Sequence, residues 1–260
     1  MSYWIRFAHG DRTGFGTLVA TTVVVHAGDM FAAPEPTGER LRLDSVRLLA
    51  PVVPSKMIAL WNNYHMLGAK LGLSTPEDPL FLIKAASSYA DPDAVVRRPK
   101  GYTGKVVFEG ELAVVIGTRC CDVDAIEAEG AIFGYTCVND ITAADVLNKD
   151  PNFVQWTRAK SFDGFSPLGP AVATGLRPET LVVRTILNGT ERQNFPVSDM
   201  VFTPADLVSL LSRDMTLMPG DVICCGTSLG VGSMKESSNT VEVIIDGIGA
   251  LRTRYEDSRA

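Results

Sequence analysis

Two acidic residues interrupt an apolar segment at a spacing that could bind a cation. Glu109 and Glu111 lie within residues 108–117, a stretch rich in Val and Ile that predicts a buried β-strand. Residues two apart on a strand project from the same face, with Cα atoms roughly 6.5 Å apart. Ala113 and Val115 continue this face and are expected to be buried, where unpaired carboxylates would be costly. We therefore expect a divalent cation to bind both acids, and a solvent-facing strand edge is the alternative.

A third carboxylate is expected from the end of the next apolar segment. Residues 131–138 predict a second strand, which Asn139 and Asp140 follow directly. The chain has 3 histidines, and none follows His65. A site of Glu109, Glu111 and Asp140 would offer oxygen ligands alone, which suits Mg²⁺, Mn²⁺ or Ca²⁺ and disfavours zinc. Three carboxylates also leave coordination positions for water and substrate.

The composition bounds the class of protein. The chain has 260 residues, 46% of them apolar, which fits one large domain or a large domain with a small appendage. Its net charge of −6 makes nucleic acid an unexpected partner. We find no apolar run near the roughly 18 residues of a membrane span and no signal-peptide pattern, so no membrane partner is expected. The 5 cysteines form no C-x-x-C motif, and the adjacent pairs at 120–121 and 224–225 are expected to be buried thiols in the cytoplasm.

The elements that must position these residues are mostly strands. Prolines at 51 and 54 favour extended backbone and predict a boundary near residue 53, between a small N-terminal domain (1–53) and a catalytic domain (54–260). Within the first domain, residues 16–25 are strand-like. Asn188-Gly189 predicts a tight hairpin. The other predicted strands are 57–61, 80–84, 104–117, 131–139, 171–174, 181–187, 222–226, 241–246 and 250–255, and the predicted helices are 65–72, 123–128 and 204–213. This pattern predicts a mixed, β-rich (α+β) fold.

One short motif suggests a different chemistry. Residues 226–230 read Gly-Thr-Ser-Leu-Gly, which matches the nucleophile elbow of serine hydrolases. That fold places its catalytic His after the Ser, and no His follows Ser228. Residues 230–233 are also a poor helix start, so we reject a serine hydrolase and interpret the glycines as sites of close backbone approach.

Several further motifs occur in an order that resembles the fumarylacetoacetate hydrolase superfamily. The resemblance runs from about residue 56 to residue 254, and its strength is the order of the motifs, since each alone is weak. The segments that carry it are 109–112, 139–143, 159–163, 167–170, 187–189, 192–193, 219–223, 226–227, 230–232 and 247–249.

The resemblance implies a β-sandwich roll with a small N-terminal domain, usually dimeric. It implies an Mg²⁺ or Mn²⁺ site at the residues here numbered Glu109, Glu111 and Asp140, in agreement with the strand argument. It also implies that Lys160 lies beside the metal and contacts the acidic end of the substrate, and that Gln193 and Thr227 bind substrate oxygens.

The chain departs from the family pattern where substrates are selected. Family members that hydrolyse carbon–carbon bonds resemble one another in carrying a His three residues after an Asn-Tyr pair. In this chain Leu67 occupies the position of that His. His65 lies two residues earlier and is interpreted as a surface or helix-cap residue. Ala144 and Leu147 replace a family Arg and Gln, and residues 148–153 form a longer segment than usual.

These observations predict a reaction class. A divalent metal chelated by a 2-oxo acid stabilises its enolate, which serves tautomerisation, decarboxylation or hydrolysis. Because hydrolysis needs a base to activate water, Leu67 favours an isomerase, tautomerase or decarboxylase acting on a 2-oxo or 2-hydroxydienoic acid, as in aromatic-compound catabolism. Enolisation needs only a modest proton acceptor, which Lys160, as a catalytic residue, or a free carboxylate could supply. The alternatives are a C–C bond hydrolase of acylpyruvate or fumarylacetoacetate type and a non-catalytic metal-binding paralogue. The expected partners are a small dicarboxylate or 2-oxo acid and a second copy of the chain.

Overall fold

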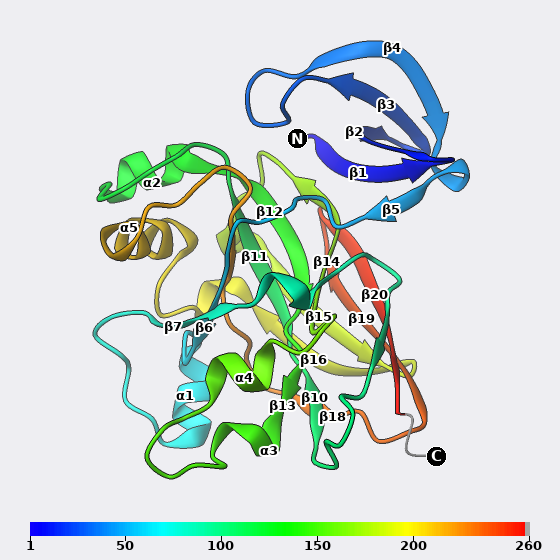
Figure 1. Cartoon of the computed structure of the whole chain (residues 1–260). Coiled ribbons are helices and arrows are strands. Elements are labelled where there is room, and N and C mark those ends of the chain that lie inside the picture. The colour runs from blue at the N-terminus through cyan, green and yellow to red at the C-terminus, as the bar shows by residue number, and fades with distance from the viewer. Residues whose placement is uncertain (258–260) are drawn as a thin grey trace.

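The structure, a computed structural model, describes residues 1–257. It is built mainly from strands with a few short helices, which confirms the mixed, β-rich fold predicted from the sequence. The described strands form three sheets. Figure 1 shows the N-terminal strands as a lobe at the top and the short helices at the left and bottom of the molecule.

The largest sheet crosses the whole molecule and contains 12 strands. Its middle strands pair antiparallel, and Gly110 of β11 lies opposite Asn139 of β12. The order along the sheet is β4 (Glu35–Arg42), β3 (Thr22–Ala27), β2 (Arg12–Val19), β1 (Tyr3–His9), β14 (Ser166–Ala173), β12 (Ile132–Asn139), β11 (Gly110–Ile116), β17 (Val222–Cys224), β6 (Met57–Trp61) and β7 (Leu80–Lys84); β5 (Arg47–Leu49) pairs with β1, and β8 (Tyr89–Ala90) pairs with β14.

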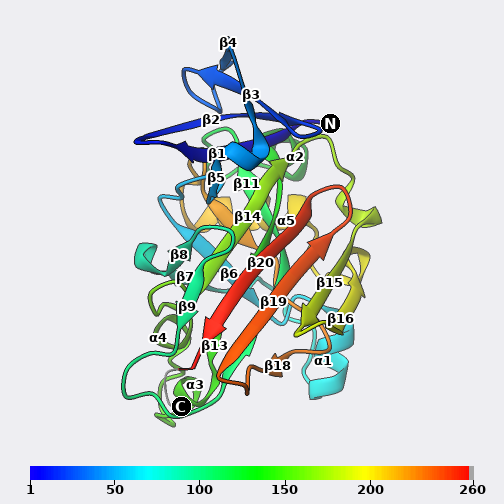
Figure 2. The ribbon, with the colours of Figure 1, turned by 90° about the vertical axis from the view of Figure 1, so that its right-hand side faces the viewer.

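Two smaller sheets complete the fold. Figure 2 shows that the larger of them lies in front of β11 and β14 in a sandwich. The predicted hairpin is confirmed, since Asn188 and Gly189 connect β15 to β16 with φ of 50° and 78°. The five-stranded sheet has the order β16 (Thr190–Pro196), β15 (Val182–Leu187), β19 (Ser238–Ile245), β20 (Gly249–Glu256) and β9 (Val95–Arg97), and the three-stranded sheet has the order β13 (Thr142–Ala143), β10 (Val106–Phe108) and β18 (Gly232–Ser233).

Both faces of β11 are buried, and each face packs against a different core. Leu112 and Val114 belong to the core that the large sheet shares with Val243 of the five-stranded sheet. Ala113 and Val115 point to the other face, where they join a second core. Because Glu111 continues the series of Ala113 and Val115, its side chain is buried on the same face, as predicted.

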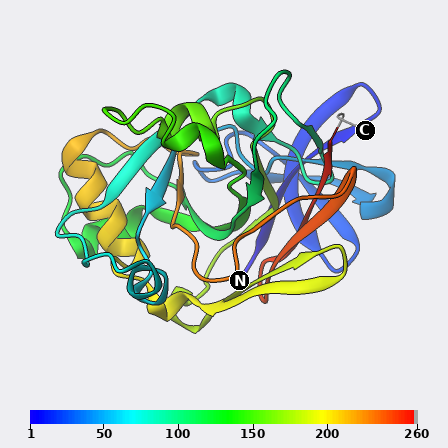
Figure 3. The ribbon, with the colours of Figure 1, turned by 90° about the horizontal axis from the view of Figure 1, so that it is seen from below.

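The helices are short, and α5 packs in the same core as one face of β11. Thr203 caps α5 in a capping box with Asp206, and Asp124 caps α2 in the same way with Glu127. In Figure 3, seen from below, α5 lies at one side and the strands β19 and β20 lie at the other. No helix within residues 1–257 has the length and apolar character needed to cross a membrane. The helices are α1 (His65–Leu71), α2 (Ala125–Ala131), α3 (Ala144–Leu147), α4 (Trp156–Lys160) and α5 (Pro204–Asp214), with 3₁₀ turns η1 (Leu43–Ser45), η2 (Ala86–Ser88), η3 (Pro178–Thr180) and η4 (Val197–Asp199).

The structure corrects three details predicted from the sequence. The strand expected over 104–117 is two strands, because β10 pairs in the three-stranded sheet and the chain changes sheets at Glu109. The segment 16–25 is likewise divided by a turn at Ala20, where φ is 52°. Cys121 is exposed, whereas Cys120, Cys224 and Cys225 are buried as expected.

The N-terminal strands extend the large sheet. Tyr3 and Trp4 of β1 pair with Ala173 and Val172 of β14, so backbone hydrogen bonding is continuous from the N-terminal lobe into the central sheet. The strand β5 ends at Leu49, and β6 begins at Met57. The domain boundary near residue 53 falls between them and stays a prediction.

Candidate metal centre

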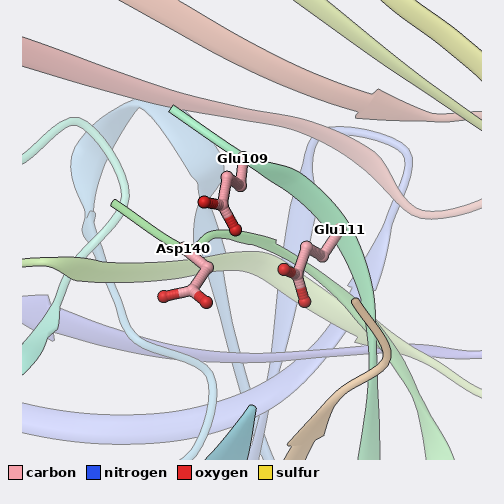
Figure 4. A group of neighbouring side chains, drawn as sticks. All are labelled: Glu109, Glu111 and Asp140. Atoms are coloured by element: carbon pink, nitrogen blue, oxygen red, sulfur yellow. The ribbon is translucent and has the colours of Figure 1, made fainter. Parts of the chain in front are cut away.

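Three carboxylates converge where β10, β11 and β12 meet. Glu109 lies between β10 and β11, Glu111 is the second residue of β11, and Asp140 directly follows β12. One oxygen from each lies within 4.8 Å of the others, and Figure 4 shows the three carboxylates turned toward one region. The strand register is the cause: Gly110 pairs with Asn139, and the amide of Asp140 donates to the carbonyl of Glu109 at 2.8 Å.

Because these acids are buried, their ionised forms need positive charge nearby. Glu111 and Asp140 are fully buried, and the side chain of Glu109 is 15% exposed. Oε2 of Glu111 accepts a hydrogen bond from the amide of Gly226 at 2.9 Å, but Oε1 has no hydrogen-bond partner among the described residues. Burial, and then repulsion from Asp140, raises the pKa of Glu111 well above its ordinary value. An unsatisfied buried oxygen beside two further carboxylates fits a hard divalent cation.

Lys160 joins two of the three acids. Its ammonium donates to Oε2 of Glu109 at 2.8 Å, to Oδ2 of Asp140 at 2.6 Å and to Oγ1 of Thr142 at 2.7 Å. Burial by itself favours neutral Lys160, but attraction to Asp140, Glu109 and Glu111 outweighs it and raises the lysine pKa. Lys160 is therefore a permanent cation within the cluster. Thr142, which sequence reasoning missed, donates to Oε1 of Glu109 at 3.0 Å.

A second lysine in the centre was also missed. Lys84 ends β7, is fully buried, and forms an ion pair with Oδ1 of Asp140. Burial disfavours ionised Asp140, but the charges of Lys160 and Lys84 outweigh it and lower the pKa of Asp140. The sequence pattern that could have indicated it is a lysine at the end of an apolar strand, two residues after buried Leu82 and therefore on the same face.

Gln193 and Thr227 contact the backbone between the two glutamates. Oε1 of Gln193 accepts from the amide of Gly110 at 2.9 Å, and its Nε2 donates to Oγ1 of Thr227 at 2.9 Å. Thr227 in turn donates to the carbonyl of Gly110 at 2.9 Å. A Cβ at Gly110 would lie 2.0 Å from Oγ1 of Thr185, so this close approach requires glycine. The substrate-binding roles that the resemblance implies for both residues stay predictions.

Two residues that bear on a hydrolytic base lie in different environments. His65 is exposed and is the first residue of α1. Leu67 is partly buried and packs against the large core.

The fold and the centre together define a β-rich protein with an all-oxygen site suited to a divalent cation. The family model "Fumarylacetoacetate (FAA) hydrolase C-terminal" matches residues 56–256. Because this match covers well over half of the chain, the protein belongs to the fumarylacetoacetate hydrolase family, which confirms the resemblance seen in the sequence. A second family model, "Rv2993c-like, N-terminal", matches residues 4–51.

Known proteins similar to the chain include enzymes of different reaction classes. A solved structure of 2-hydroxyhepta-2,4-diene-1,7-dioate isomerase from Mycobacterium marinum is 36% identical, covers 100% of both chains and has a TM-score of 0.90. Oxaloacetate tautomerase from Bacillus subtilis is 36% identical over 80% of this chain and 73% of that protein. Fumarylpyruvate hydrolase from Pseudomonas aeruginosa, solved with Mn²⁺ and pyruvate, is 27% identical, covers 82% of this chain and 92% of that chain, and has a TM-score of 0.73.

Proposed function

We propose that this protein is a divalent-metal-dependent enzyme that stabilises the enolate of a 2-oxo or 2-hydroxydienoic acid, as an isomerase or tautomerase. Decarboxylation is a further outcome open to the same enolate, and aromatic-compound catabolism is the expected setting. The observation that carries the proposal is the buried convergence of Glu109, Glu111 and Asp140, with one carboxylate oxygen left without a donor. The similar isomerase and tautomerase support the reaction class.

The residues of the centre have different proposed roles. Glu109, Glu111 and Asp140 would hold Mg²⁺ or Mn²⁺, with Ca²⁺ as a further hard ion that suits oxygen ligands. When bound, the ion supplies a Lewis acid that polarises a 2-oxo carbonyl. Lys160 binds and orients the anionic end of the substrate, because its ammonium lies among the carboxylates that would hold the metal. Gln193 and Thr227 would contact substrate oxygens and keep Gly110 in place.

Isomerisation is favoured over hydrolysis by the environment of Leu67. The resemblance places a hydrolytic His at this position, and here an apolar side chain packs against the core instead. Proton removal next to a polarised carbonyl needs a modest acceptor, whereas hydrolysis also needs a base that activates water. We therefore expect enolisation to be faster than cleavage.

Hydrogen exchange should show this preference directly. In deuterated water with Mg²⁺ or Mn²⁺, we expect the hydrogens next to the oxo group of oxaloacetate to exchange at an enzyme-dependent rate. The same preparation should cleave acylpyruvates slowly or not at all. The exchange is measured by proton NMR, with chelator-treated protein as the control.

The alternatives predict different results in the same assay. Fast acylpyruvate cleavage with negligible exchange would show the C–C hydrolase that the similar fumarylpyruvate hydrolase suggests. Loss of that cleavage in His65→Ala would identify the exposed histidine as its base. Metal binding without turnover of any 2-oxo acid would indicate the non-catalytic paralogue.

We also propose that the protein is a homodimer joined through the edge of the large sheet. The strand β7 ends the order of this sheet and pairs with β6 along one side. Leu80, Phe81 and Ile83 of β7 are 45%, 38% and 37% exposed. These exposed apolar side chains on the last strand of the sheet form a surface that a second copy would cover.

A charge on this edge should dissociate the dimer. Analytical ultracentrifugation is expected to give a dimer for the wild-type protein and a monomer for Phe81→Lys, because a buried lysine without a partner is costly. Ile126→Lys is the matched control, since Ile126 is 83% exposed on α2. A monomeric wild type, or a dimeric Phe81→Lys variant, would contradict this interface.

A further inference from the structure

The two lysines of the centre contact different oxygens of Asp140. Lys160 donates to Oδ2, whereas Lys84 forms its ion pair with Oδ1. Lys84 also donates to the carbonyl oxygen of Phe165 at 3.1 Å. Lys160 reaches Glu109 and Thr142 as well, whereas within residues 1–257 the ammonium of Lys84 contacts Asp140 and a backbone carbonyl alone. The two lysines therefore have different partners and need different explanations.

The position of Lys84 separates its side chain from solvent. Its side chain is 0% exposed, and it ends a strand that is hydrogen-bonded to β6. The helix α4, which carries Lys160, is attached to this strand end: Thr157 donates to the carbonyl of Ile83 at 3.1 Å, and the amide of Ala85 donates to Oγ of Ser161 at 3.0 Å. Lys84 is thus a fixed charge in a rigid part of the centre.

The net charge of the centre depends on Lys84. In the ionised form that binds a metal, the three carboxylates and two ammonium groups carry one net negative charge, which attracts a divalent cation. With such a cation in place, the centre carries one net positive charge, which attracts an anion. Without Lys84 the corresponding values are two negative charges and zero. Buried charges at these distances interact strongly, so one charge changes both affinities.

We propose that Lys84 is a positioning residue that holds Oδ1 of Asp140 and sets the charge of the centre, and thereby its affinity for the metal and for a substrate anion. The inference rests on the proposed metal-dependent function. It predicts effects of opposite sign when Lys84 loses its charge: the metal binds more tightly, and an anion binds the metal-loaded protein more weakly. A role in packing alone predicts that both affinities fall together, because distorted ligands bind both partners poorly.

The test uses two variants of Lys84 and a matched control. Lys84→Gln removes the charge and keeps a hydrogen-bond donor, whereas Lys84→Met removes both. Lys56→Met is the control, because Lys56 pairs with buried Asp221 outside the carboxylate cluster. Titration calorimetry measures the affinity for Mn²⁺ and then the affinity of the Mn²⁺-loaded protein for oxalate, a small dianion that can chelate a metal.

We expect both Lys84 variants to bind Mn²⁺ at least about tenfold more tightly and oxalate at least about tenfold more weakly than the wild type. Lys56→Met should leave both affinities within about twofold. Unchanged or weaker Mn²⁺ binding by a folded Lys84→Gln variant overturns the proposal, as does the same pair of changes in Lys56→Met. If Lys84→Met does not fold, Lys84→Gln decides the outcome. A wild type that binds no Mn²⁺ contradicts the metal site itself, which is a distinguishable result.

Discussion

Glu111→Gln is expected to lower the affinity for Mn²⁺ at least about a hundredfold and to abolish metal-dependent turnover. Mutation of a residue that only hydrogen-bonds to a metal ligand typically lowers metal affinity about 10–100-fold. The loss should be larger for Glu111, because it offers a ligand oxygen directly. The same variant should melt at a higher temperature than the wild type after both are treated with a chelator. Calorimetric titration and thermal unfolding measure the two effects.

The stability effect follows from the raised pKa of Glu111. Burial makes its ionised form unfavourable in the folded protein, so this residue lowers stability as the pH rises above the unfolded-state pKa of about 4.3. Glutamine carries no charge, and its amide can accept from the Gly226 amide while donating to neighbouring carboxylates. The difference in melting temperature should therefore be small at acidic pH and grow toward neutral pH.

A matched control separates the site from a general charge effect. Glu129→Gln makes the same change at an exposed residue on α2 and should leave metal affinity and melting temperature unchanged. If Glu111→Gln bound Mn²⁺ as tightly as the wild type, the assignment of Glu111 as a ligand would be wrong.

The second large effect is expected at Lys160. Lys160→Met keeps the length of the side chain and removes its charge, so kcat/KM should fall by roughly 10²–10³, the usual cost of losing one charge-stabilising group. Metal binding should persist, because all three carboxylates remain. Comparison of steady-state kinetics with calorimetric Mn²⁺ titration shows whether the loss concerns the substrate or the metal.

The control for this variant changes a lysine on the preceding segment. Lys149 is exposed between α3 and α4, so Lys149→Met alters the net charge equally without touching the centre. Its kinetics should match those of the wild type. Normal kcat/KM in Lys160→Met would remove the proposed role in substrate binding, and loss of Mn²⁺ binding would instead show that Lys160 maintains the ligand geometry.

The sequence alone was sufficient to predict that the three acids would meet. A strand repeats every two residues, so Glu109 and Glu111 were expected to share a side, and Asp140 followed the next strand in the chain. Antiparallel pairing of these two strands then places the start of the first strand beside the end of the second. The ordered motifs predicted the family, and the hairpin at Asn188-Gly189 was predictable because its residues tolerate positive φ.

Tertiary structure decided the rest of the centre. Lys84 reaches Asp140 because β7 joins the same sheet through β6, a pairing that local sequence patterns do not encode. The break at Glu109 depends on which sheets β10 and β11 enter, and the contacts of Gln193 with Gly110 depend on how two sheets pack. Local periodicity thus determined which side chains share a face, whereas long-range packing determined which charges surround them and how strongly burial changes their ionisation.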